Sequence, residues 1–295
     1  MKLISLILMV SLLCGLLSGC AGKRKEIIIG AKDFTEQYIL AEILALLIEE
    51  NTDISVTLRT DLSSDVIFAA IRTGVVDVYV DYTGTIYGSY LARSETRDPF
   101  KVYEYARNAF AENYNLFVLP PLGFNNTYNL AVTNEVAQEF QLQTITDLAS
   151  VSENFIIGGS AEFLTRNDGL PNLKIHYDMI FKSELAVDGI DRYTSLMNDD
   201  IQVAETFATD GHILAYDITV LKDDKHFFLP YEGVIVMRTE LSDELGIEPY
   251  LLFTGLTDLL TDDVMRDLNY RVDVNNEAPR DAAEYFLRKN NLIAG

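Results

Sequence analysis

"DVYVDYTGTIYGSY" (residues 77–90) joins a strand-like pattern to a turn and then to an aromatic segment. Apolar and polar residues alternate from Asp77 to Tyr82, which predicts a half-buried strand. A glycine between two threonines then breaks the pattern with small residues. Such a break is typical either of an ordinary turn or of a binding site at the carboxyl end of a strand.

Strand and helix patterns alternate on both sides of this stretch, which predicts an α/β protein with parallel sheets covered by helices on both faces. The helical pattern at 33–50 begins with Asp33 and Glu36 at the spacing of a capping box. In chain order the patterned segments are EIIIG (26–30), DFTEQYILAEILALLIEE (33–50), ISVTLR (54–59), DPFKVYEYARNAFAENY (98–114), YNLAVT (128–133), NEVAQEFQ (134–141) and NFIIGGS (154–160).

Two extended segments, 120–129 and 222–238, suggest how the chain divides into domains. With 295 residues, of which 48% are hydrophobic, the chain can bury two cores of ordinary size. If the chain crosses over through the first segment and returns through the second, one domain is inserted into the other. We therefore expect residues 26–127 and 223–295 to form lobe 1 and residues 128–222 to form lobe 2.

The first residues read as a targeting segment rather than as part of either core. Lys2 is followed by an apolar run, Leu3–Leu17, which is too short to span a membrane comfortably and has the length of a secretory signal. The sequence Leu-Ser-Gly-Cys that ends at Cys20 resembles the lipobox of bacterial lipoproteins, although a plain signal peptide with a chance cysteine is the alternative. We expect residues 1–19 to be a signal peptide, Cys20 to carry lipid, and residues 20–25 to form a tether.

The cysteines and histidines give no sign of catalysis or metal binding. Cys14 would leave with the signal peptide and Cys20 would carry lipid, so no thiol remains for a disulfide, a metal or a nucleophile. His176, His212 and His226 lack metal-ligand spacing, and we expect them at the surface or in turns. No nucleophile elbow or P-loop is present, and the formal net charge of −22 disfavours nucleic acid as a partner. We expect no cofactor and no enzymatic activity.

Several blocks taken together resemble the substrate-binding proteins of quaternary-ammonium ABC importers, which are receptors for glycine betaine, carnitine and choline. This resemblance implies the type II periplasmic-binding-protein fold, in which two α/β lobes joined by two extended crossovers close over a ligand. The blocks occur in the family's order: IIIGAKDFTEQYILAEILALLIEE (27–50), GVVDVYVDYTGT (74–85), NNTYNLAV (125–132), RNDGLPNL (166–173), FATDGHILAYDITVLKDDKHFF (207–228) and AAEYFLRKNNLI (282–293).

The chemistry of such a ligand explains which residue types are needed. A trimethylammonium group has a positive charge but no N–H donor, so it is held by the negative faces of aromatic rings, each contributing about 0.5–2 kcal/mol. The chain has no tryptophan, and its 16 tyrosines and 15 phenylalanines must supply such a cage. The resemblance implies that the cage walls are Tyr82, Tyr128, Tyr193 and Tyr216.

A zwitterionic ligand also needs a site for its carboxylate. The resemblance implies that Lys32, Thr85 and Arg166 hold this group, for which an arginine fork, a lysine charge and a hydroxyl are suited. Without the motifs, Lys32 and Arg166 would be read as surface charges. Asn126 is expected to orient the ligand, and Asp210 either supplies negative charge at a distance or forms a turn.

The predicted function is an extracytoplasmic receptor, anchored to the membrane through lipid on Cys20, that delivers a quaternary ammonium compound to an ABC permease and its ATPase. The protein is expected to be a monomer. Lys32 and Arg166 favour carboxylated ligands, such as glycine betaine, proline betaine or carnitine, over choline. The alternatives are a receptor for a larger trimethylated amino acid such as ergothioneine, a sensory receptor that presents its ligand to a signalling protein, and an enzyme of the same two-lobed shape.

Overall fold

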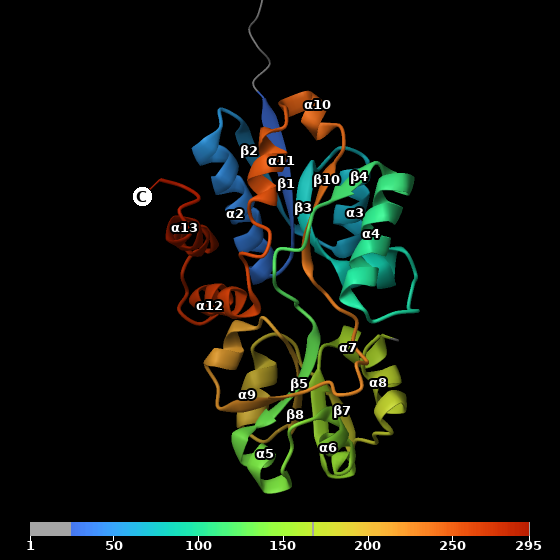
Figure 1. Cartoon of the computed structure of the whole chain (residues 1–295). Helices are drawn as coiled ribbons and strands as arrows, with labels where there is room; N and C mark the ends of the chain where they lie inside the picture. Colours follow the sequence, from blue (N-terminus) through green and yellow to red (C-terminus); the bar gives the residue numbers. More distant parts are fainter. Residues whose placement is uncertain (1–24, 167, 295) are drawn as a thin grey trace, which may run out of the picture.

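The computed structural model describes residues 25–166 and 168–294, and it contains two α/β bodies, each built on a five-stranded sheet (Figure 1). We call them lobe 1, which carries the N-terminal strand, and lobe 2, which follows residue 127. The predicted signal peptide and the lipidation site Cys20 lie outside the described residues. Of the helices within the described ranges, none is long and apolar enough to cross a membrane.

Lobe 1 combines the beginning and the end of the described chain. Its sheet has the order β2 (Ser55–Leu62), β1 (Glu26–Lys32), β3 (Val78–Tyr82), β10 (Gly233–Arg238) and β4 (Leu116–Val118). Its helices are α2 (Thr35–Asn51), α3 (Ser64–Arg72), η1 (Thr85–Tyr90), α4 (Pro99–Tyr114), α10 (Leu241–Leu245), α11 (Glu248–Thr254), α12 (Asp262–Asp273) and α13 (Pro279–Lys289).

Lobe 2 is continuous in sequence. Its sheet has the order β7 (Ser183–Ala186), β6 (Ile156–Gly159), β8 (Val203–Phe207), β5 (Tyr128–Thr133) and β9 (Ile218–Leu221). Its helices are α5 (Asn134–Phe140), α6 (Ile145–Ala149), η2 (Ser152–Asn154), α7 (Ala161–Thr165), α8 (Leu170–Tyr177), α9 (Asp191–Met197) and η3 (Gly211–Leu214).

Both sheets are mixed, whereas the alternation of elements had predicted parallel sheets. β1 pairs in parallel with β2 and β3, but β10 runs antiparallel to β3 and β4. In lobe 2, β6 pairs in parallel with β7 and β8, whereas β5 runs antiparallel to β8 and β9. The reason is topological: β5 and β10 each follow a crossover between the lobes, so the chain enters the sheet from the opposite end.

β3 is buried on both faces, in contrast to the half-buried strand that its alternating pattern predicted. It is the central strand of its sheet, so Val78 and Val80 pack in the core that contains α2, and Tyr79 packs in the core that contains α3 and α4. The polar residue of the pattern, Asp81, is fully buried and forms an ion pair of 2.6 Å with Lys32. The alternation therefore separates two cores and does not separate core from solvent.

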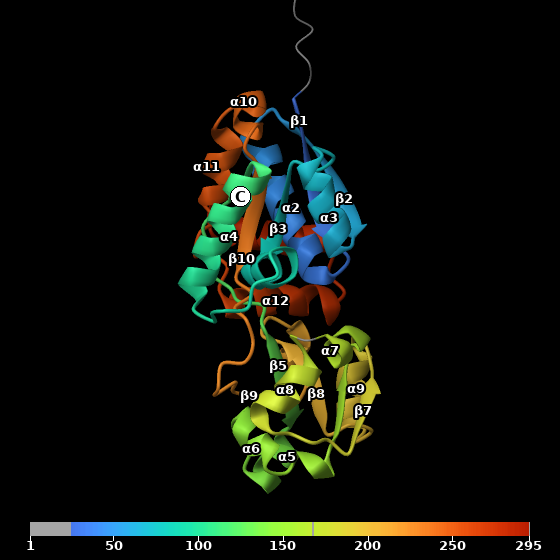
Figure 2. The same cartoon turned by 90° about the vertical axis from the view of Figure 1, so that its right-hand side faces the viewer.

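The lobes meet at a helix contact in addition to the two crossovers. α12 of lobe 1 lies along the edge that faces lobe 2, as Figure 2 shows, and packs against η3. A Cβ atom on Gly211 would lie 2.4 Å from the backbone nitrogen of Tyr270, so only glycine permits this approach. The guanidinium of Arg266 also donates to the carbonyl oxygen of Ala208 in lobe 2 at 2.9 Å.

Candidate ligand-binding cleft

A cleft of about 1100 Å³ lies between the two lobes. On the lobe 1 side it is lined by the carboxyl ends of β1 and β3 and by the start of α2, and on the lobe 2 side by α7, α9 and η3. Tyr82 is the last residue of β3 and Thr85 is the first residue of η1, and both line the cleft. The turn in the opening stretch of sequence therefore borders the cavity.

Aromatic rings from both lobes line this cleft. In lobe 1, Phe34 and Tyr82 lie with ring centroids 6.3 Å apart and planes within 23°. In lobe 2, the ring of Tyr128 lies 5.0 Å from that of Phe207, and 5.8 Å from that of Tyr231 on the second crossover. Tyr128 is half-buried, and burial raises the pKa of its hydroxyl to about 12. The rings thus remain neutral and present π faces.

The four tyrosines expected to form a cage do not come together in this structure. Tyr82 and Tyr128 line the cleft, whereas Tyr193 and Tyr216 are absent from its lining. Tyr193 is 1% exposed, its hydroxyl donates to Asp210, and its ring stacks on Tyr216 at 5.4 Å and on His212 at 5.0 Å. Tyr193 and Tyr216 therefore pack next to Asp210 and His212, and it is Asp210 and His212 that line the cleft.

The spacing of Asp33 and Glu36 predicted a capping box at the start of α2. In the structure Glu36 does not cap the helix and lies in the wall of the cleft instead. Phe34 occupies the N-cap position without a side-chain hydrogen bond, and Asp33 accepts a hydrogen bond from Tyr38 at 2.6 Å. Glu36 is 3% exposed, and the hydroxyl of Tyr82 donates to its Oε1 atom at 2.7 Å. Burial raises the pKa of Glu36, and its hydrogen bonds partly oppose this shift.

The predicted carboxylate-binding residues line the cleft, but the basic ones already have acidic partners. Lys32 pairs with Asp81, and its Nζ atom lies 5.2 Å from the centroid of the Tyr82 ring. Arg166 donates through Nε and Nη2 to Asp168 at 2.8 and 2.6 Å. This fork raises the pKa of Arg166, while burial opposes the shift. Its Nη1 atom is not engaged by Asp168 and lies 3.7 Å from a carboxylate oxygen of Glu162, so a ligand carboxylate would compete with Glu162 for it.

Thr85 and Asn126 also line the cleft, at different places. Thr85 is partly exposed at the start of η1, where a hydroxyl can reach a ligand. Asn126 lies on the first crossover and donates through Nδ2 to Glu36 at 2.9 Å. The donor group of Asn126 is therefore engaged by Glu36 and helps to orient that carboxylate.

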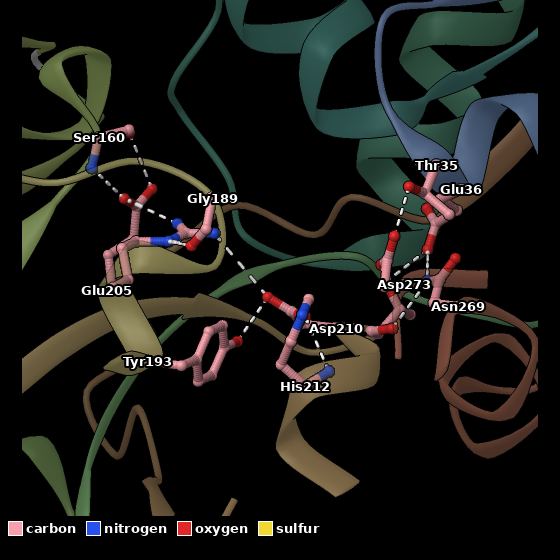
Figure 3. Close-up of polar contacts among 12 residues, drawn as sticks. Thr35, Glu36, Ser160, Gly189, Tyr193, Glu205, Asp210, His212, Asn269 and Asp273 are labelled. Atoms are coloured by element: carbon pink, nitrogen blue, oxygen red, sulfur yellow. Dashed lines mark hydrogen bonds and ion pairs between the residues drawn. The ribbon is translucent and has the colours of Figure 1, made fainter. Parts of the chain in front are cut away.

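A second polar cluster belongs to lobe 2 and faces the same cleft (Figure 3). Arg192 forms an ion pair of 3.1 Å with Glu205, which also accepts the backbone N–H of Ser160 at 2.6 Å. Asp210 accepts hydrogen bonds from Tyr193 and from the ring of His212. Burial opposes ionisation of Asp210, but hydrogen bonds from His212 and Tyr193 hold its pKa below the ordinary value.

His212 differs from the surface or turn position expected for all three histidines. His176 and His226 are exposed, whereas His212 is partly buried and lines the cleft. Its hydrogen bond to Asp210 raises its pKa, and the charge of Asp273 across the lobe boundary adds to the effect while burial opposes it. Within the described ranges, no group of three or more His, Cys, Asp or Glu side chains is arranged to hold a metal ion.

Asp273 completes the polar rim on the lobe 1 side, next to Glu36 in Figure 3. Its carboxylate accepts a hydrogen bond from the hydroxyl of Thr35 at 2.6 Å. Burial raises the pKa of Asp273, and the hydrogen bond from Thr35 partly opposes this shift. Carboxylates from both lobes therefore meet at this end of the cleft.

The cleft has an excess of negative charge. Its described lining includes three basic side chains, and each of them is paired with a carboxylate: Lys32 with Asp81, Arg166 with Asp168 and Arg192 with Glu205. Seven acidic side chains line it: Asp33, Glu36, Asp65, Glu162, Asp188, Asp210 and Asp273. The negative potential of such a concave surface attracts cations.

Sequence reasoning missed three of the residues that shape the cleft. Phe34 lies between the end of β1 and the start of α2, and an aromatic residue between a strand and a helix was the only local signal for it. Tyr231 lies in the second crossover, and nothing in the sequence of this extended segment indicated that its tyrosine lines the cleft. Glu36 was assigned to helix capping because the spacing from Asp33 fits that role equally well.

Two mixed α/β lobes, joined by two crossovers around a cleft that both line, define the class of two-lobed substrate-binding proteins. A sequence profile of one family in this class, OpuAC, the substrate-binding domain of the ABC-type glycine betaine transport system, matches residues 25–289. The chain belongs to this family. Members of the family are substrate-binding proteins of transporters, which bind a small molecule outside the cytoplasm and work with a permease.

Individual relatives agree with the family and differ in the ligand they are named for. The chain is 32% identical over 285 residues to the carnitine transport binding protein OpuCC of Listeria monocytogenes, which covers 95% of this chain and 92% of the relative. It is 35% identical over 273 residues to the ergothioneine transport permease/ergothioneine binding protein EgtU of Helicobacter pylori, covering 92% of this chain. The chain spans about half of that relative, 48% of its length.

A solved structure confirms the predicted fold. The chain matches the crystal structure of a glycine betaine/carnitine/choline ABC transporter protein with a TM-score of 0.82 and 32% identity, covering 90% of this chain and 99% of the other. The lactococcal OpuAC complex with glycine betaine shares the fold at a TM-score of 0.59 and 15% identity, covering 90% of this chain and 96% of that one. The prediction of a type II binding-protein fold from the sequence blocks is therefore correct.

Proposed function

We propose that this protein captures a quaternary ammonium compound between its lobes and delivers it to an ABC permease. One observation carries the proposal: aromatic rings from both lobes, among them Tyr82 and Tyr128, line a cleft that has an excess of carboxylates. A methylated ammonium has no donor for a carboxylate to accept, but it gains from ring faces and from a negative potential at the same time.

The cage in this proposal consists of the rings that line the cleft. Phe34 and Tyr82 form the lobe 1 wall, Tyr128 forms the lobe 2 wall, and Tyr231 closes the hinge side. Each face contributes about 0.5–2 kcal/mol, so several together account for selective binding. Tyr193 supports this site indirectly, because its hydroxyl holds Asp210 at the cleft surface.

Carboxylated quaternary ammonium compounds are the proposed preferred ligands. The Nη1 atom of Arg166 and the hydroxyl of Thr85 offer donors to a ligand carboxylate. The charge of Lys32 near one face of Tyr82 repels an ammonium group on that face and attracts an anionic one. We therefore expect a zwitterion to place its anionic end toward Lys32 and its methyl groups against Tyr128 and the part of the Tyr82 ring that Lys32 does not cover.

A larger trimethylated amino acid such as ergothioneine is the second candidate ligand. The relative named for ergothioneine binding is 35% identical to this chain. The cleft volume of about 1100 Å³ leaves room for a side chain beyond a betaine head group. Binding of both ligand types to the same rings is compatible with the site, because the trimethylammonium group is common to them.

The proposed location and partners follow the sequence. We propose that the signal peptide is removed before Cys20, that lipid on this cysteine anchors the mature protein, and that it acts as a monomer beside a permease and its ATPase. We propose a binding role without catalysis. Metabolic labelling with a fatty acid, with Cys20→Ser as the control, tests the anchor.

A screen of ligands against the protein that lacks residues 1–20 tests the function. Glycine betaine, carnitine, choline and ergothioneine are added in a thermal-unfolding assay, and hits are titrated by calorimetry. We expect at least one to raise the melting temperature in a concentration-dependent way. Tyr82→Ala should lower its affinity at least tenfold, whereas Tyr105→Ala, which alters an exposed ring of α4 that is absent from the cleft lining, should leave it unchanged. If no quaternary ammonium compound binds, the proposal is wrong.

A further inference from the structure

The carboxylate of Glu36 gathers four donors that come from separate parts of the chain. Oε1 accepts from the hydroxyl of Tyr82 at 2.7 Å and from Asn126 at 2.9 Å. Oε2 accepts from the hydroxyl of Thr209 at 2.6 Å and from Asn269 at 3.0 Å. All four groups are held by one side chain that is 3% exposed.

This carboxylate has no basic partner among the described residues. Its pKa is raised by burial, and the groups that oppose the shift are four neutral hydrogen-bond donors. A buried anion without a counter-ion is unfavourable unless a cation approaches it. Glu36 lines the cleft proposed to receive a cation, so the missing positive charge can be that of the ligand.

The hydrogen bond from Tyr82 links this charge to the aromatic wall. A phenol that donates to a carboxylate gains electron density in its ring, which makes the ring face a better partner for a cation. Gln37 donates to the same hydroxyl at 3.1 Å, which fixes the direction in which the hydroxyl donates to Glu36. Among the hydrogen-bond partners of the Tyr82 hydroxyl, Glu36 is the one that carries a carboxylate and accepts its hydrogen bond.

The other donors link Tyr82 to the arrangement of the lobes. Thr209 follows β8 in lobe 2, Asn126 lies on the first crossover, and Asn269 lies on α12. The Nδ2 group of Asn269 donates to Glu36 and also to the carbonyl oxygen of Thr209 at 2.8 Å. One amide group of lobe 1 therefore contacts both Glu36 and lobe 2. A displacement of lobe 2 would break the bond between Thr209 and Glu36.

We propose that Glu36 is a positioning residue for cation recognition: its carboxylate orients and polarises the Tyr82 ring and ties that ring to lobe 2 through Thr209. This inference rests on the proposed function, since it concerns how the same cleft binds a quaternary ammonium ion. It adds that the carboxylate of Glu36 sets the affinity of the Tyr82 ring for a cation. The ligand itself donates no hydrogen bond to this carboxylate.

A double-mutant cycle on Glu36 and Tyr82 tests the proposal. Glu36→Gln keeps the shape but removes the charge, and Tyr82→Phe removes the donor but keeps the ring. The affinity of each variant for the quaternary ammonium ligand found with the wild-type protein is measured by calorimetry. We expect Glu36→Gln to weaken binding at least tenfold and Tyr82→Phe at least threefold. The affinity of the double variant should be within twofold of that of Glu36→Gln, because both substitutions remove the same hydrogen bond.

An uncharged analogue separates recognition of charge from loss of shape. 3,3-Dimethylbutan-1-ol replaces the trimethylammonium group of choline with a tert-butyl group, and its affinity is measured by displacement of the ligand. Glu36→Gln should change its affinity less than threefold, whereas a merely structural role would weaken cation and analogue alike. Glu36→Asp, which keeps the charge, should retain more cation affinity than Glu36→Gln.

The outcomes distinguish this proposal from the proposed function. If the wild-type protein binds no quaternary ammonium compound, the function itself is wrong. If the wild type binds but Glu36→Gln stays within twofold of it, or if the two single losses multiply in the double variant, the role of Glu36 is wrong and the function stands. Should Glu36→Gln fail to fold, an unchanged cation affinity of Tyr82→Phe overturns the proposal by itself.

Discussion

The hydroxyl of Thr209 in lobe 2 donates a hydrogen bond of 2.6 Å to the carboxylate of Glu36 in lobe 1. Glu36 in turn accepts the hydroxyl of Tyr82, the aromatic residue at the end of β3. The buried carboxylate of Glu36 therefore connects Tyr82, in the lobe 1 wall of the cleft, with Thr209 in lobe 2. A movement of lobe 2 relative to lobe 1 would therefore also change the surroundings of Tyr82.

Arg166→Ala is expected to weaken betaine far more than choline. The guanidinium can donate to a ligand carboxylate through Nη1, and a hydrogen bond to a charged group is worth about 1.5–3 kcal/mol, which corresponds to roughly 10–150-fold in affinity. Choline has no carboxylate, and the freed charge of Asp168 favours a cation. Calorimetry with both ligands measures the difference. Equal losses for betaine and choline would exclude Arg166 as the carboxylate-binding residue.

Removal of the buried charge of Lys32 is expected to destabilise the protein. Lys32→Met leaves Asp81, which is fully buried, without its partner, and an unpaired buried charge costs about 3–5 kcal/mol. Chemical denaturation measures the free energy of unfolding. The control is Lys32→Met combined with Asp81→Asn, which should recover a substantial part of the loss. If the double variant is no more stable than the single one, the ion pair does not explain the effect.

Gly211→Ala is expected to disturb the contact between η3 and α12. The new methyl group would lie 2.4 Å from the nitrogen of Tyr270 and 2.7 Å from the carbonyl carbon of Asn269, and backbone atoms cannot move aside as side chains do. Overpacking of this kind costs about 1–3 kcal/mol. We expect a lower melting temperature than in Gly88→Ala, where the nearest atom is the end of the Leu229 side chain. Equal melting temperatures would mean that this contact adjusts freely.

The contribution of His212 to stability is expected to fall as pH rises. Asp210 raises the pKa of His212 in the folded protein, assisted by Asp273 and opposed by burial and by Arg192. A folded-state pKa above the ordinary value of 6.5 gives stability that is complete below that value and is lost as pH rises through the folded pKa. The difference in unfolding free energy between wild type and His212→Asn should be larger at pH 6 than at pH 9. Parallel pH profiles would contradict this.

The order of helices and strands was predictable because it depends on local periodicity. The pattern of residues 33–50 predicted the helix that the structure shows as α2, and the strand before Tyr82 ends where the sequence indicated. The direction of β5 and β10 was not predictable in this way. It depends on which end of a sheet the chain enters after a crossover, and periodicity carries no information about direction.

The role of Glu36 could not be predicted, since its partners are distant in sequence. Asn269 and Thr209 lie 233 and 173 residues away from it. The helix start supplied a local explanation for the acid, and only the packing of α12 and η3 shows that its side chain points elsewhere. The resemblance to a family identified Tyr82 and Tyr128, which line the cleft, but isolated tyrosines such as Tyr231 carry no sequence signal of exposure to it.

In the proposed function, aromatic faces from both lobes surround a methylated ammonium group. A structure of the protein with its best quaternary ammonium ligand tests it most directly, through the distances from the ligand nitrogen to the ring centroids. We expect the nitrogen to lie within about 6 Å of the ring centroids of both Tyr82 and Tyr128. A ligand whose nitrogen lies beyond that distance from both rings, beside a carboxylate alone, would contradict it.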